Sequence, residues 1–351
     1  MQKFMEKIYL KNLDKLIEKC TELPNTIFCS KAKILAFIIL NVRYEAIMKQ
    51  RCLKCHPYKL VVEMVDASIA FLESICEISF LDSKEEIGKP FGPMEAEHED
   101  LFQKLWVNFN ESEYQNRIDR FVHRIKINKL ESIVRSSKII DFGCGYGNFA
   151  HALIQCGANF VKGVDFGRDS INYAKNARDR LGVSEEIISF EVASVYKTKE
   201  PSGFYDFAIQ NGVFHHLEND DLAYREVYRV LKPNGKFWIY TDGSGAISHD
   251  LWDYSRKALE EIPSEFVLDF LTEMGVETNK RYHLGDGLNA VYKHTSLEDL
   301  TSRLGRIGFK FVRRLVGGYD TDFDHDVIEK DYYGIEKFGS GDIRILVQKV
   351  S

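Results

Sequence analysis

The stretch Lys138-Ile-Ile-Asp-Phe-Gly-Cys-Gly-Tyr-Gly-Asn148 decides the fold of this chain. It consists of a short apolar run, typical of a buried strand, followed directly by three glycines at alternating positions and then by a helical pattern. Glycine permits turn conformations and allows a backbone to approach a ligand closely. Because ligands of open α/β sheets bind at the carboxyl ends of the parallel strands, we expect a ligand to bind at this turn.

Strand and helix patterns alternate through the chain beyond this stretch. The expected strands are residues 138–142, 160–165, 188–193, 205–210, 236–240, 309–316 and 343–349. The expected helices are residues 148–156, 169–181, 220–231 and 297–307. Such alternation indicates an α/β domain with a mainly parallel sheet. Two insertions interrupt the pattern: residues 243–295 are rich in aromatic side chains, and residues 317–342 are acidic.

The segment before the sheet has a different character. Its first 80 residues show apolar side chains at helical spacing, with lysine and glutamate on the other face. A break rich in glycine and proline follows at residues 82–97. We therefore expect a helical N-terminal domain at residues 1–95 and a second domain at residues 96–351 that holds both insertions. Three roles for the helical domain stay open: formation of a homodimer, a lid over the substrate, or binding of a partner.

The composition is that of a folded protein of about two domains. The chain has 351 residues and a mass of 40.6 kDa, whereas a domain has roughly 150 residues. Apolar residues make up 44% and charged residues 28%, which argues against a disordered or fibrous chain. With 47 basic and 53 acidic residues the net charge is −6, so the chain lacks the basic excess expected of a protein that binds duplex nucleic acid.

Targeting signals and membrane spans are not expected. The N-terminus lacks the apolar core of a signal peptide, and the longest apolar run, residues 34–40, is far shorter than a span of roughly 20 residues. Seven cysteines, an odd number, do not indicate a disulfide framework, so we expect a protein of the reducing cytoplasm. The stretch Cys52-Leu-Lys-Cys55-His56 matches a haem-attachment pattern and half of a zinc site. Because no second ligand pair is evident nearby, ordinary thiols at a helix end and no bound metal are the preferred interpretation.

The spacing of the glycines separates two classes of cofactor. Dinucleotide-binding folds use G-x-G-x-x-G and place a pyrophosphate at the helix N-terminus, whereas this chain has G-x-G-x-G followed by Asn148. Asp141 lies two positions before the first glycine, where a carboxylate suits an ammonium group better than a diphosphate. Asp165, at the end of the next expected strand, can accept hydrogen bonds from both hydroxyls of a ribose. An adenosine that carries an amino acid combines these features, which points to S-adenosyl-L-methionine.

With these residues the sequence resembles the class I S-adenosylmethionine-dependent methyltransferases, especially the ubiquinone/menaquinone-biosynthesis-like branch. Asp141 to Gly147 matches the D-x-G-x-G-x-G loop of that family, and Asp165 matches its acidic ribose position. Two further matches are Asn211-Gly-Val-Phe-His-His-Leu217, after the fourth strand, and Glu226-Val-Tyr-Arg-Val-Leu-Lys-Pro-Asn-Gly235, before the fifth. The resemblance is close over residues 138–243. It implies a Rossmann-like, doubly wound sheet of seven mostly parallel strands, with S-adenosyl-L-methionine as methyl donor and S-adenosyl-L-homocysteine as product.

The resemblance also implies a set of cofactor contacts at the carboxyl ends of the strands. These candidates are Asp141, Gly143, Cys144, Gly145, Gly147, Asp165, Phe166, Ser194, Val195 and Asn211. Asn211 would bond the methionine portion of the cofactor. The family often has an acidic residue after the third strand, against the adenine amino group. This chain has Ser194 there, so backbone groups would carry more of that contact.

Catalytic and substrate-binding candidates follow from the same resemblance. Methyl transfer from a sulfonium requires alignment of the reactants, and a base only where the nucleophile must lose a proton. His215 and His216, just past the fourth strand, are the candidate bases, with packing of the next helix as the alternative role. The aromatic insertion is the expected substrate wall. Its candidate substrate contacts are Tyr254, Tyr282, His283 and Tyr292.

Roles can also be predicted for two further segments, one before the sheet and one in the acidic insertion. His123 and Arg124 precede the core and are expected to close over the cofactor. The acidic run from Asp320 to Asp326 is interpreted as a solvated loop in preference to a cation site, because ligands so close in sequence need a special loop shape.

Together these observations predict SN2 methyl transfer to an oxygen, nitrogen, carbon or sulfur atom of a small-molecule metabolite. One alternative is a methyltransferase that acts on protein or RNA, although the acidic charge balance counts against RNA. The other is a cofactor-binding scaffold without catalysis whose helical domain binds a partner. The intact glycine loop counts against that scaffold.

Overall fold

The chain forms two compact units, which are described separately. The computed structural model describes residues 2–50, 53–78, 87, 111–277, 280, 281, 284, 285, 288 and 292–350. The helical unit comprises Met1–His98, Gly245–Ala290 and Asp326–Gly339. The sheet unit comprises Glu99–Ser244, Val291–His325 and Ser340–Ser351.

The sheet unit contains a seven-stranded sheet with the order β3-β2-β1-β4-β5-β7-β6. The strands are β1 (Lys138–Phe142), β2 (Phe160–Asp165), β3 (Ile188–Val192), β4 (Tyr205–Asn211), β5 (Leu231–Asp242), β6 (Phe309–Arg314) and β7 (Asp342–Lys349). The pairs among β1 to β5 are parallel, whereas β7 runs antiparallel to both β5 and β6. This order, which reverses direction beside β1, confirms the predicted doubly wound, mostly parallel fold.

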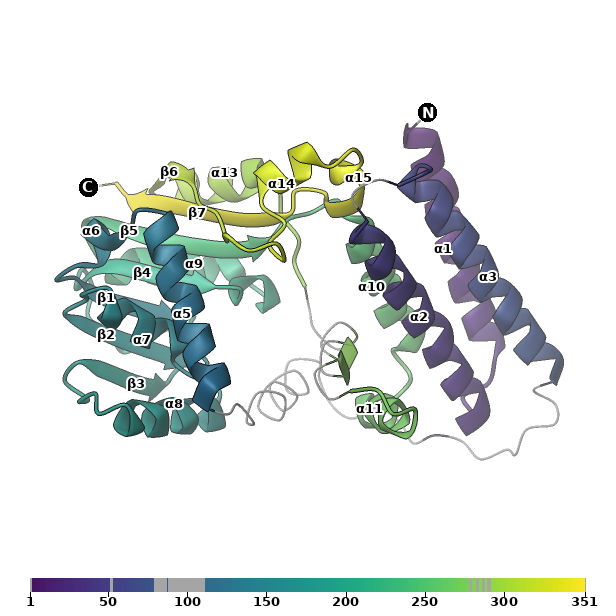
Figure 1. The fold of residues 1–351 in the computed structure, drawn as a ribbon, viewed down its shortest axis with the longest axis horizontal. Helices are drawn as coiled ribbons and strands as arrows, with labels where there is room; N and C mark the ends of the chain where they lie inside the picture. The colour runs from purple at the N-terminus through teal and green to yellow at the C-terminus, as the bar shows by residue number, and fades with distance from the viewer. Residues whose placement is uncertain are drawn as a thin grey trace. The chain divides into compact units, whose positions relative to one another are not determined.

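Each face of the sheet has its own hydrophobic core, because successive side chains of a strand point to opposite faces. In β1, Ile139 belongs to one core and Ile140 to the other. The first core is completed by α5 (Glu111–Ile127), α6 (Glu131–Val134), α7 (Asn148–Gln155) and α8 (Arg168–Arg180). The second is completed by α9 (Asp220–Val230) and α13 (Leu297–Ile307). Figure 1 shows α5 and α7 on one face of the sheet and α9 on the other.

The helical unit is built around three long helices, α1 (Gln2–Glu22), α2 (Ile27–Met48) and α3 (Pro57–Ile78). Thr26 begins α2, because its side-chain oxygen accepts a hydrogen bond from the backbone N–H of Cys29 at 3.3 Å. The helix is apolar around most of its circumference, as expected of a helix covered on several sides. Ile34, Phe37 and Leu40 lie in the common core of the unit.

Two segments from later in the chain complete this unit, and the first of them contributes to its core. Helices α10 (Ile247–Leu259) and α11 (Ser264–Glu273) bury Leu251 and Leu271 against the N-terminal helices, and the short α14 (His325–Lys330) and α15 (Gly334–Phe338) follow them. Asn41 of α2 donates a 2.8 Å hydrogen bond to the buried hydroxyl of Ser255 on α10. The observed division therefore differs from the expected one, which assigned both insertions to the sheet domain. Because α2 exposes apolar surface on several sides, the inserted helices serve to cover it.

The acidic insertion is not a solvated loop, and that interpretation is wrong at its centre. Asp322 and Asp324 are buried and paired with arginines. Arg344 of β7 bonds Asp322 at 2.9 Å and Asp324 at 2.7 Å, and Arg124 of α5 bonds Asp322 at 2.8 Å. The carboxylates can be buried because each one meets a guanidinium. Within the described ranges no group of acidic, histidine or cysteine side chains has the arrangement of a metal site.

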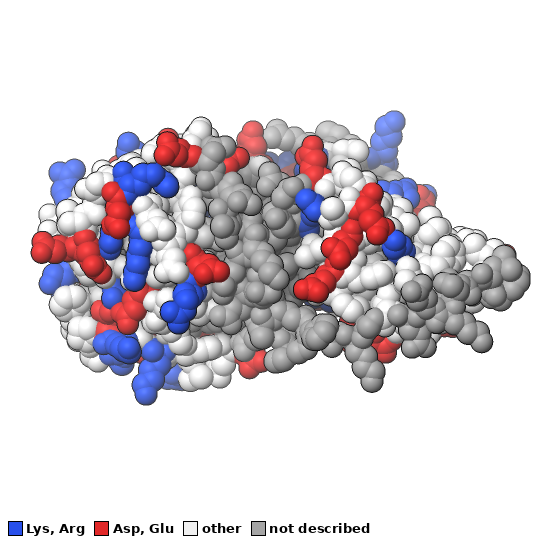
Figure 2. Space-filling view, turned by 90° about the horizontal axis from the view of Figure 1, so that it is seen from below, with Lys and Arg blue, Asp and Glu red and all other residues white. Residues whose placement is uncertain are grey.

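The length of the helices and the charge of the surface bear on membranes and nucleic acids. None of the helices in the described parts of the chain is both long and apolar enough to cross a membrane. On the face of the sheet unit seen at the left of Figure 2, basic and acidic side chains are interspersed. That face therefore does not present the single basic surface that a nucleic-acid phosphate backbone requires.

We predict that Asp322→Ala strongly destabilises the sheet unit. The substitution leaves the buried Arg124 without its carboxylate, and removing one partner of a buried ion pair costs about 3–5 kcal/mol. Urea unfolding followed by tryptophan fluorescence measures the loss. Asp320→Ala removes an exposed aspartate from the same loop and should change the free energy of unfolding by less than about 0.5 kcal/mol. Equal midpoints for the two variants would contradict the prediction.

Candidate functional site

The glycine turn closes the end of β1 over the end of β2. The backbone N–H groups of Gly143 and Cys144 both donate to the carbonyl of Val164, at 2.8 and 3.1 Å. Gly143, Gly145 and Gly147 all have positive φ, at +72°, +49° and +78°. L-residues other than glycine rarely adopt this backbone conformation, so the three glycines are needed for the shape of the turn.

The three glycines face different surroundings. A Cβ atom on Gly143 would lie 2.5 Å from a methyl group of Val213, and one on Gly147 would lie 2.4 Å from the ring of Phe190. These two glycines therefore allow neighbouring segments to pack against the turn. A Cβ on Gly145 would meet nothing within 4 Å. Gly145 thus faces open space, into which a ligand can approach the backbone.

Asp141 is a buried carboxylate with an unsatisfied oxygen. The residue is 2% exposed, and its Oδ2 atom has no hydrogen-bond partner among the described residues. Burial, and to a smaller extent the nearby charge of Asp165, raises the pKa of Asp141 to about 7. Such a group is costly in the unliganded protein, and a bound cation would remove that cost.

A second unsatisfied acceptor lies at the end of the neighbouring strand. The Oδ1 atom of Asn211, the last residue of β4, is buried and also lacks a partner within the described ranges. β4 pairs directly with β1, so both acceptors lie at the same carboxyl edge of the sheet. A carboxylate and an amide oxygen together fit the ammonium group of an amino acid, which has three N–H donors.

Asp165 already organises the backbone on which a ribose would lie. Its two oxygens accept hydrogen bonds from the N–H groups of Gly145 and Gly167, each at 2.9 Å. A carboxylate oxygen can accept more than one hydrogen bond, so the same atoms can also accept ribose hydroxyls. The next residue, Phe166, has 45% of its surface exposed and presents an aromatic ring at this edge.

The other predicted cofactor contacts have structural partners. Val195 is buried, and the hydroxyl oxygen of Ser194 accepts a 3.3 Å hydrogen bond from the N–H of Tyr196. Cys144 packs closely against Gly163, and burial raises the pKa of its thiol well above the ordinary value. Cys144 is therefore a neutral packing residue of the turn.

Gln210, which is not among the residues predicted from the sequence, holds the loop after β4. Its side-chain amide donates to the carbonyl of Tyr240 at 2.9 Å, and its Oε1 accepts from the N–H groups of Val213 and Phe214 at 3.1 and 3.3 Å. The residue is completely buried. A polar side chain within an otherwise apolar strand was the available signal, because buried amides are normally hydrogen-bonded.

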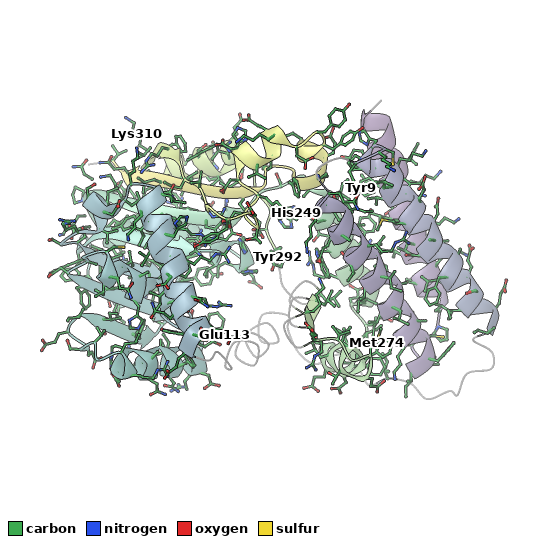
Figure 3. All side chains as sticks on the ribbon, in the orientation of Figure 1. Tyr9, Glu113, His249, Met274, Tyr292 and Lys310 are labelled. Atoms are coloured by element: carbon green, nitrogen blue, oxygen red, sulfur yellow. The ribbon has the colours of Figure 1, made fainter. Side chains whose placement is uncertain are left out.

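His215 and His216 form a contact pair just past this loop, in the short helix η2 (Phe214–His216). Their Nε2 atoms are 2.9 Å apart. The ring of Tyr292 stacks on His215 at 5.4 Å between centroids and meets the edge of His216 at 4.5 Å. Figure 3 shows Tyr292 on the segment that leads towards α13, beside the strands of the sheet unit. The structure thus brings two catalytic candidates and one substrate candidate together.

Of the other three substrate candidates, the structure describes one. Tyr254 lies in the helical unit, where its hydroxyl donates to Asp14 of α1 at 2.8 Å. Tyr282 and His283 lie outside the described residues. Their roles in substrate binding stay predictions.

Helix α5 covers the glycine turn through Tyr114, which is not among the predicted site residues. The hydroxyl of Tyr114 donates to the carbonyl of Tyr146 within the turn, at 2.8 Å. A hydrogen bond to a backbone carbonyl leaves no side-chain pattern, so nothing in the sequence marked Tyr114. The expectation that His123 and Arg124 close over the cofactor is wrong. Arg124 binds Asp322, and the ring of His123 packs against Tyr319, because both lie beside the acidic insertion.

Comparisons with known proteins agree with this geometry. Residues 133–283 match the family model described as "Methyltransferase domain". The mitochondrial ubiquinone biosynthesis O-methyltransferase of Rattus norvegicus is 30% identical over 115 residues, which cover 32% of this chain and 33% of the rat protein. The sterol 24-C-methyltransferase erg6 of Aspergillus fumigatus is 31% identical over 110 residues, which cover 31% of this chain and 28% of that protein.

The name of a third relative refers to methylation of a nitrogen atom. Phosphoethanolamine N-methyltransferase 3 of Arabidopsis thaliana is 25% identical over 160 residues, which cover 41% of this chain and 32% of that protein. The chain therefore spans about a third of the length of these curated relatives. S-Adenosylmethionine is the methyl donor of the family, and the open turn and two unsatisfied acceptors fit its amino-acid end. Residues 133–283 thus match a methyltransferase domain, and the sheet order and glycine turn of the chain are like those of the class I S-adenosylmethionine-dependent methyltransferases.

Proposed function

We propose that this protein transfers the methyl group of S-adenosylmethionine to a small molecule. The observation that carries the proposal is the pair of buried, unsatisfied acceptors at one edge of the sheet, Asp141 Oδ2 and Asn211 Oδ1. They lie on adjacent strands beside Gly145, the glycine of the turn that faces open space. A ligand with an ammonium group supplies the hydrogen-bond donors and the charge that this edge lacks.

Different residues of the chain would bind different parts of the cofactor. Asp141 and Asn211 would hold the ammonium group, Asp165 would hold the ribose, and Phe166, Ser194 and Val195 would border the adenine. When bound, S-adenosylmethionine supplies a methyl group that its sulfonium has already activated. The bond from methyl carbon to sulfur breaks as the bond to the acceptor atom forms, and the electron pair stays on sulfur. The protein's main task is then to align the acceptor with the methyl group.

Three observations support a small molecule as the acceptor. Aromatic and imidazole rings, which suit a small-molecule pocket, gather beside the end of β4 at His215, His216 and Tyr292. The visible face of the sheet unit mixes both charges (Figure 2). The printed names of the three relatives refer to ubiquinone, sterol and phosphoethanolamine, and to oxygen, carbon and nitrogen. Because the names differ in the methylated atom, the similarity supports the reaction and does not select the acceptor atom.

The location that we propose is a reducing one such as the cytoplasm. Cys55 of the Cys52–Cys55 spacing forms no disulfide within the described part of the chain, and neither do Cys20, Cys144 and Cys156. The partner of Cys55 in that spacing, Cys52, lies outside the described residues. Dimerisation through the N-terminal helices stays a prediction.

We predict that Asp141→Asn weakens binding of S-adenosylhomocysteine by roughly 30-fold. The amide keeps the size of the side chain but removes the charge opposite the ammonium group, a loss of about 2 kcal/mol. Isothermal titration calorimetry measures the affinity. 5′-Methylthioadenosine, which has the same nucleoside but no amino acid, serves as the matched ligand and should bind both proteins equally.

Asp165→Asn provides the matched variant for this experiment. Because both ligands have the same ribose, this substitution should weaken both by a similar factor. If Asp141→Asn instead weakened the two ligands equally, the ammonium assignment would be withdrawn.

The binding of S-adenosylhomocysteine should also depend on pH through Asp141. Its pKa of about 7 in the folded protein means that the carboxyl is mostly protonated at pH 5.5 and mostly ionised at pH 7.5. Only the ionised form attracts the ammonium group, so affinity should fall by about tenfold between pH 7.5 and pH 5.5. The affinity of Asp141→Asn should stay constant over this range, and a parallel fall in the variant would assign the dependence to another group.

The same pKa has a consequence for stability without ligand. The folded state retains the Asp141 proton at pH values at which the unfolded chain has lost it. The free energy of unfolding should therefore fall as pH rises from about 4 to about 7. This part of the dependence should be missing from Asp141→Asn.

The small-molecule proposal is tested with labelled methyl groups. The protein is incubated with S-adenosylmethionine labelled in its methyl group and with cell extract, and the products are separated by size and identified by mass spectrometry. We expect label in the low-molecular-mass fraction. Label in protein or RNA would replace the proposed substrate class, and binding of the cofactor without any labelled product would favour a cofactor-binding scaffold.

A further inference from the structure

Alternation of side chains along the strands places Asp242, the last residue of β5, on the same face of the sheet as the proposed cofactor contacts. Trp238 of β5 and Ile209 of β4 both contribute to the first core. Because every second residue of a strand points to the same face, Asp242 shares this face with Asn211. β4 and β5 are paired and parallel, so Asp242 and Asn211 also end neighbouring strands at the carboxyl edge.

Tyr240 fixes the position of the Asp242 carboxyl group. The guanidinium of Arg344 on β7 lies over the ring of Tyr240, 4.3 Å from its centroid. On the side of β4, a Cβ atom on Gly212 would lie 3.2 Å from the same ring. The hydroxyl of Tyr240 donates to Oδ1 of Asp242 at 3.4 Å. Contacts from both neighbours of β5 thus hold the ring that bonds Oδ1.

The other carboxyl oxygen of Asp242, Oδ2, can be reached by a ligand. Within the described parts of the chain, the bond from Tyr240 is the one hydrogen bond that this carboxyl group accepts. Asp242 is partly exposed, although burial is the main influence on its carboxyl group. A group that protein surrounds and that keeps accessible surface lies where a small molecule can approach it.

Burial raises the pKa of the Asp242 carboxyl above its ordinary value. Three nearby groups oppose this effect in part: His294, Tyr240 and Arg344. The guanidinium of Arg344 is itself shared with three aspartates of the acidic insertion and β7. Asp342 lies opposite Asp242 on β7, and Nδ1 of His215 in η2 accepts from the backbone N–H of Asp242 at 3.3 Å. Since burial outweighs the opposing groups, Asp242 is a stronger base than an exposed aspartate.

We propose that the methyl acceptor is a hydroxyl or amine group and that Asp242 takes its proton during methyl transfer. The inference rests on the proposed methyl transfer and names its substrate class and its base. A lone pair of the acceptor oxygen or nitrogen forms the bond to the methyl carbon as the bond from that carbon to sulfur breaks, with the electron pair left on sulfur. The proton of the acceptor atom passes to Oδ2 of Asp242. Because Asp242 keeps accessible surface, it can then release the proton to water.

The chemistry of the carboxyl group selects this class of acceptor. A carboxylate removed from bulk water costs free energy unless it meets a donor or a cation. A hydroxyl or an amine supplies an N–H or O–H donor to Oδ2, and it also has a proton to lose. A thioether, a tertiary amine or a carbon atom supplies no such donor.

The first experiment identifies the methylated atom. The full chain is incubated with cell extract and S-adenosylmethionine labelled in its methyl group, and tandem mass spectrometry and nuclear magnetic resonance locate the methyl group in the purified product. We expect it on an oxygen or nitrogen atom that carried hydrogen in the unmethylated compound. A methyl group on carbon, on sulfur or on a nitrogen that carried no hydrogen would overturn the proposal.

The unmethylated compound then serves as substrate for variants of Asp242. Asp242→Asn keeps an oxygen for the hydroxyl of Tyr240 but cannot take a proton, so kcat should fall by about 100-fold or more. Asp342→Asn is the matched control, because its amide oxygen can still accept from the N–H of Phe323 and from Arg344. Its kcat should stay within about threefold of wild type. An equally small change in Asp242→Asn would overturn the role of Asp242.

Two further variants test whether a carboxylate is what the reaction needs. Asp242→Glu keeps the carboxyl group and should retain more activity than Asp242→Asn. Asp242→Ala leaves space for a carboxylate from solution, so sodium formate should raise its rate by about tenfold or more, whereas sodium chloride at the same ionic strength should not. Equal rates for Asp242→Glu and Asp242→Asn, with no effect of formate, would contradict the proposal.

Calorimetry with S-adenosylhomocysteine separates this inference from the proposed function. All variants should bind this ligand within about twofold of the wild-type affinity, which also shows that they are folded. If the wild-type protein binds the ligand and yields a labelled product but Asp242→Asn stays active, only the assignment of Asp242 fails. If the wild-type protein does not bind the ligand at millimolar concentration, the proposed methyl transfer fails and this inference fails with it.

Discussion

The hydrogen bonds from the turn of Gly143 and Cys144 to the carbonyl of Val164 are the constraint on which the site depends. They join the ends of β1 and β2 and so place Asp141 and Asp165 on the same edge. Two of the glycines in this turn are contacted by side chains from β3 and from the loop after β4. A larger residue would therefore displace several strand ends at once. The turn is a ligand-binding element and also the junction at which the strands of the sheet unit converge.

Prediction from the sequence succeeded where a local pattern carried the information. The strands other than β5 are close to their expected ranges, and β1, β2 and α13 have the expected bounds, whereas β5 already begins at Leu231 instead of Lys236. The buried strands and amphipathic helices of an α/β sheet leave such patterns because their periods differ. The cofactor candidates Asp141 and Asn211 stand at neighbouring strand ends for the same reason, because parallel strands all end at one edge.

What could not be predicted depends on contacts between distant segments. Arg124 and Arg344 neutralise Asp322 from positions 198 and 22 residues away, so composition alone suggested a solvated acidic loop. Tyr114 and Gln210 act on backbone groups, which have no sequence signature.

Two buried acceptors, at the carboxyl ends of β1 and β4, lack hydrogen-bond partners among the described residues. A buried acceptor without a partner costs about 1–3 kcal/mol, so Asp141 and Asn211 lower the stability of the empty protein. The glycine turn that follows Asp141 is, by contrast, closely packed at Gly143 and Gly147. This arrangement prepares the site before the ligand arrives, because the groups need not reorganise when they bind it.

The three-part composition of the helical unit has a consequence for how the chain reaches its native state. The hydrogen bond between Asn41 and Ser255 joins residues 214 positions apart, and Tyr44 of α2 donates to the carbonyl of Lys337, 293 positions away. During synthesis, the N-terminal helices must therefore wait, with apolar faces of α2 uncovered, until most of the sheet unit has been made. Contacts over such distances form slowly, and exposed apolar helices in the meantime favour aggregation or chaperone binding. These helices are thus translated well before their core can be completed, and a fragment that contains them alone lacks the residues that cover them.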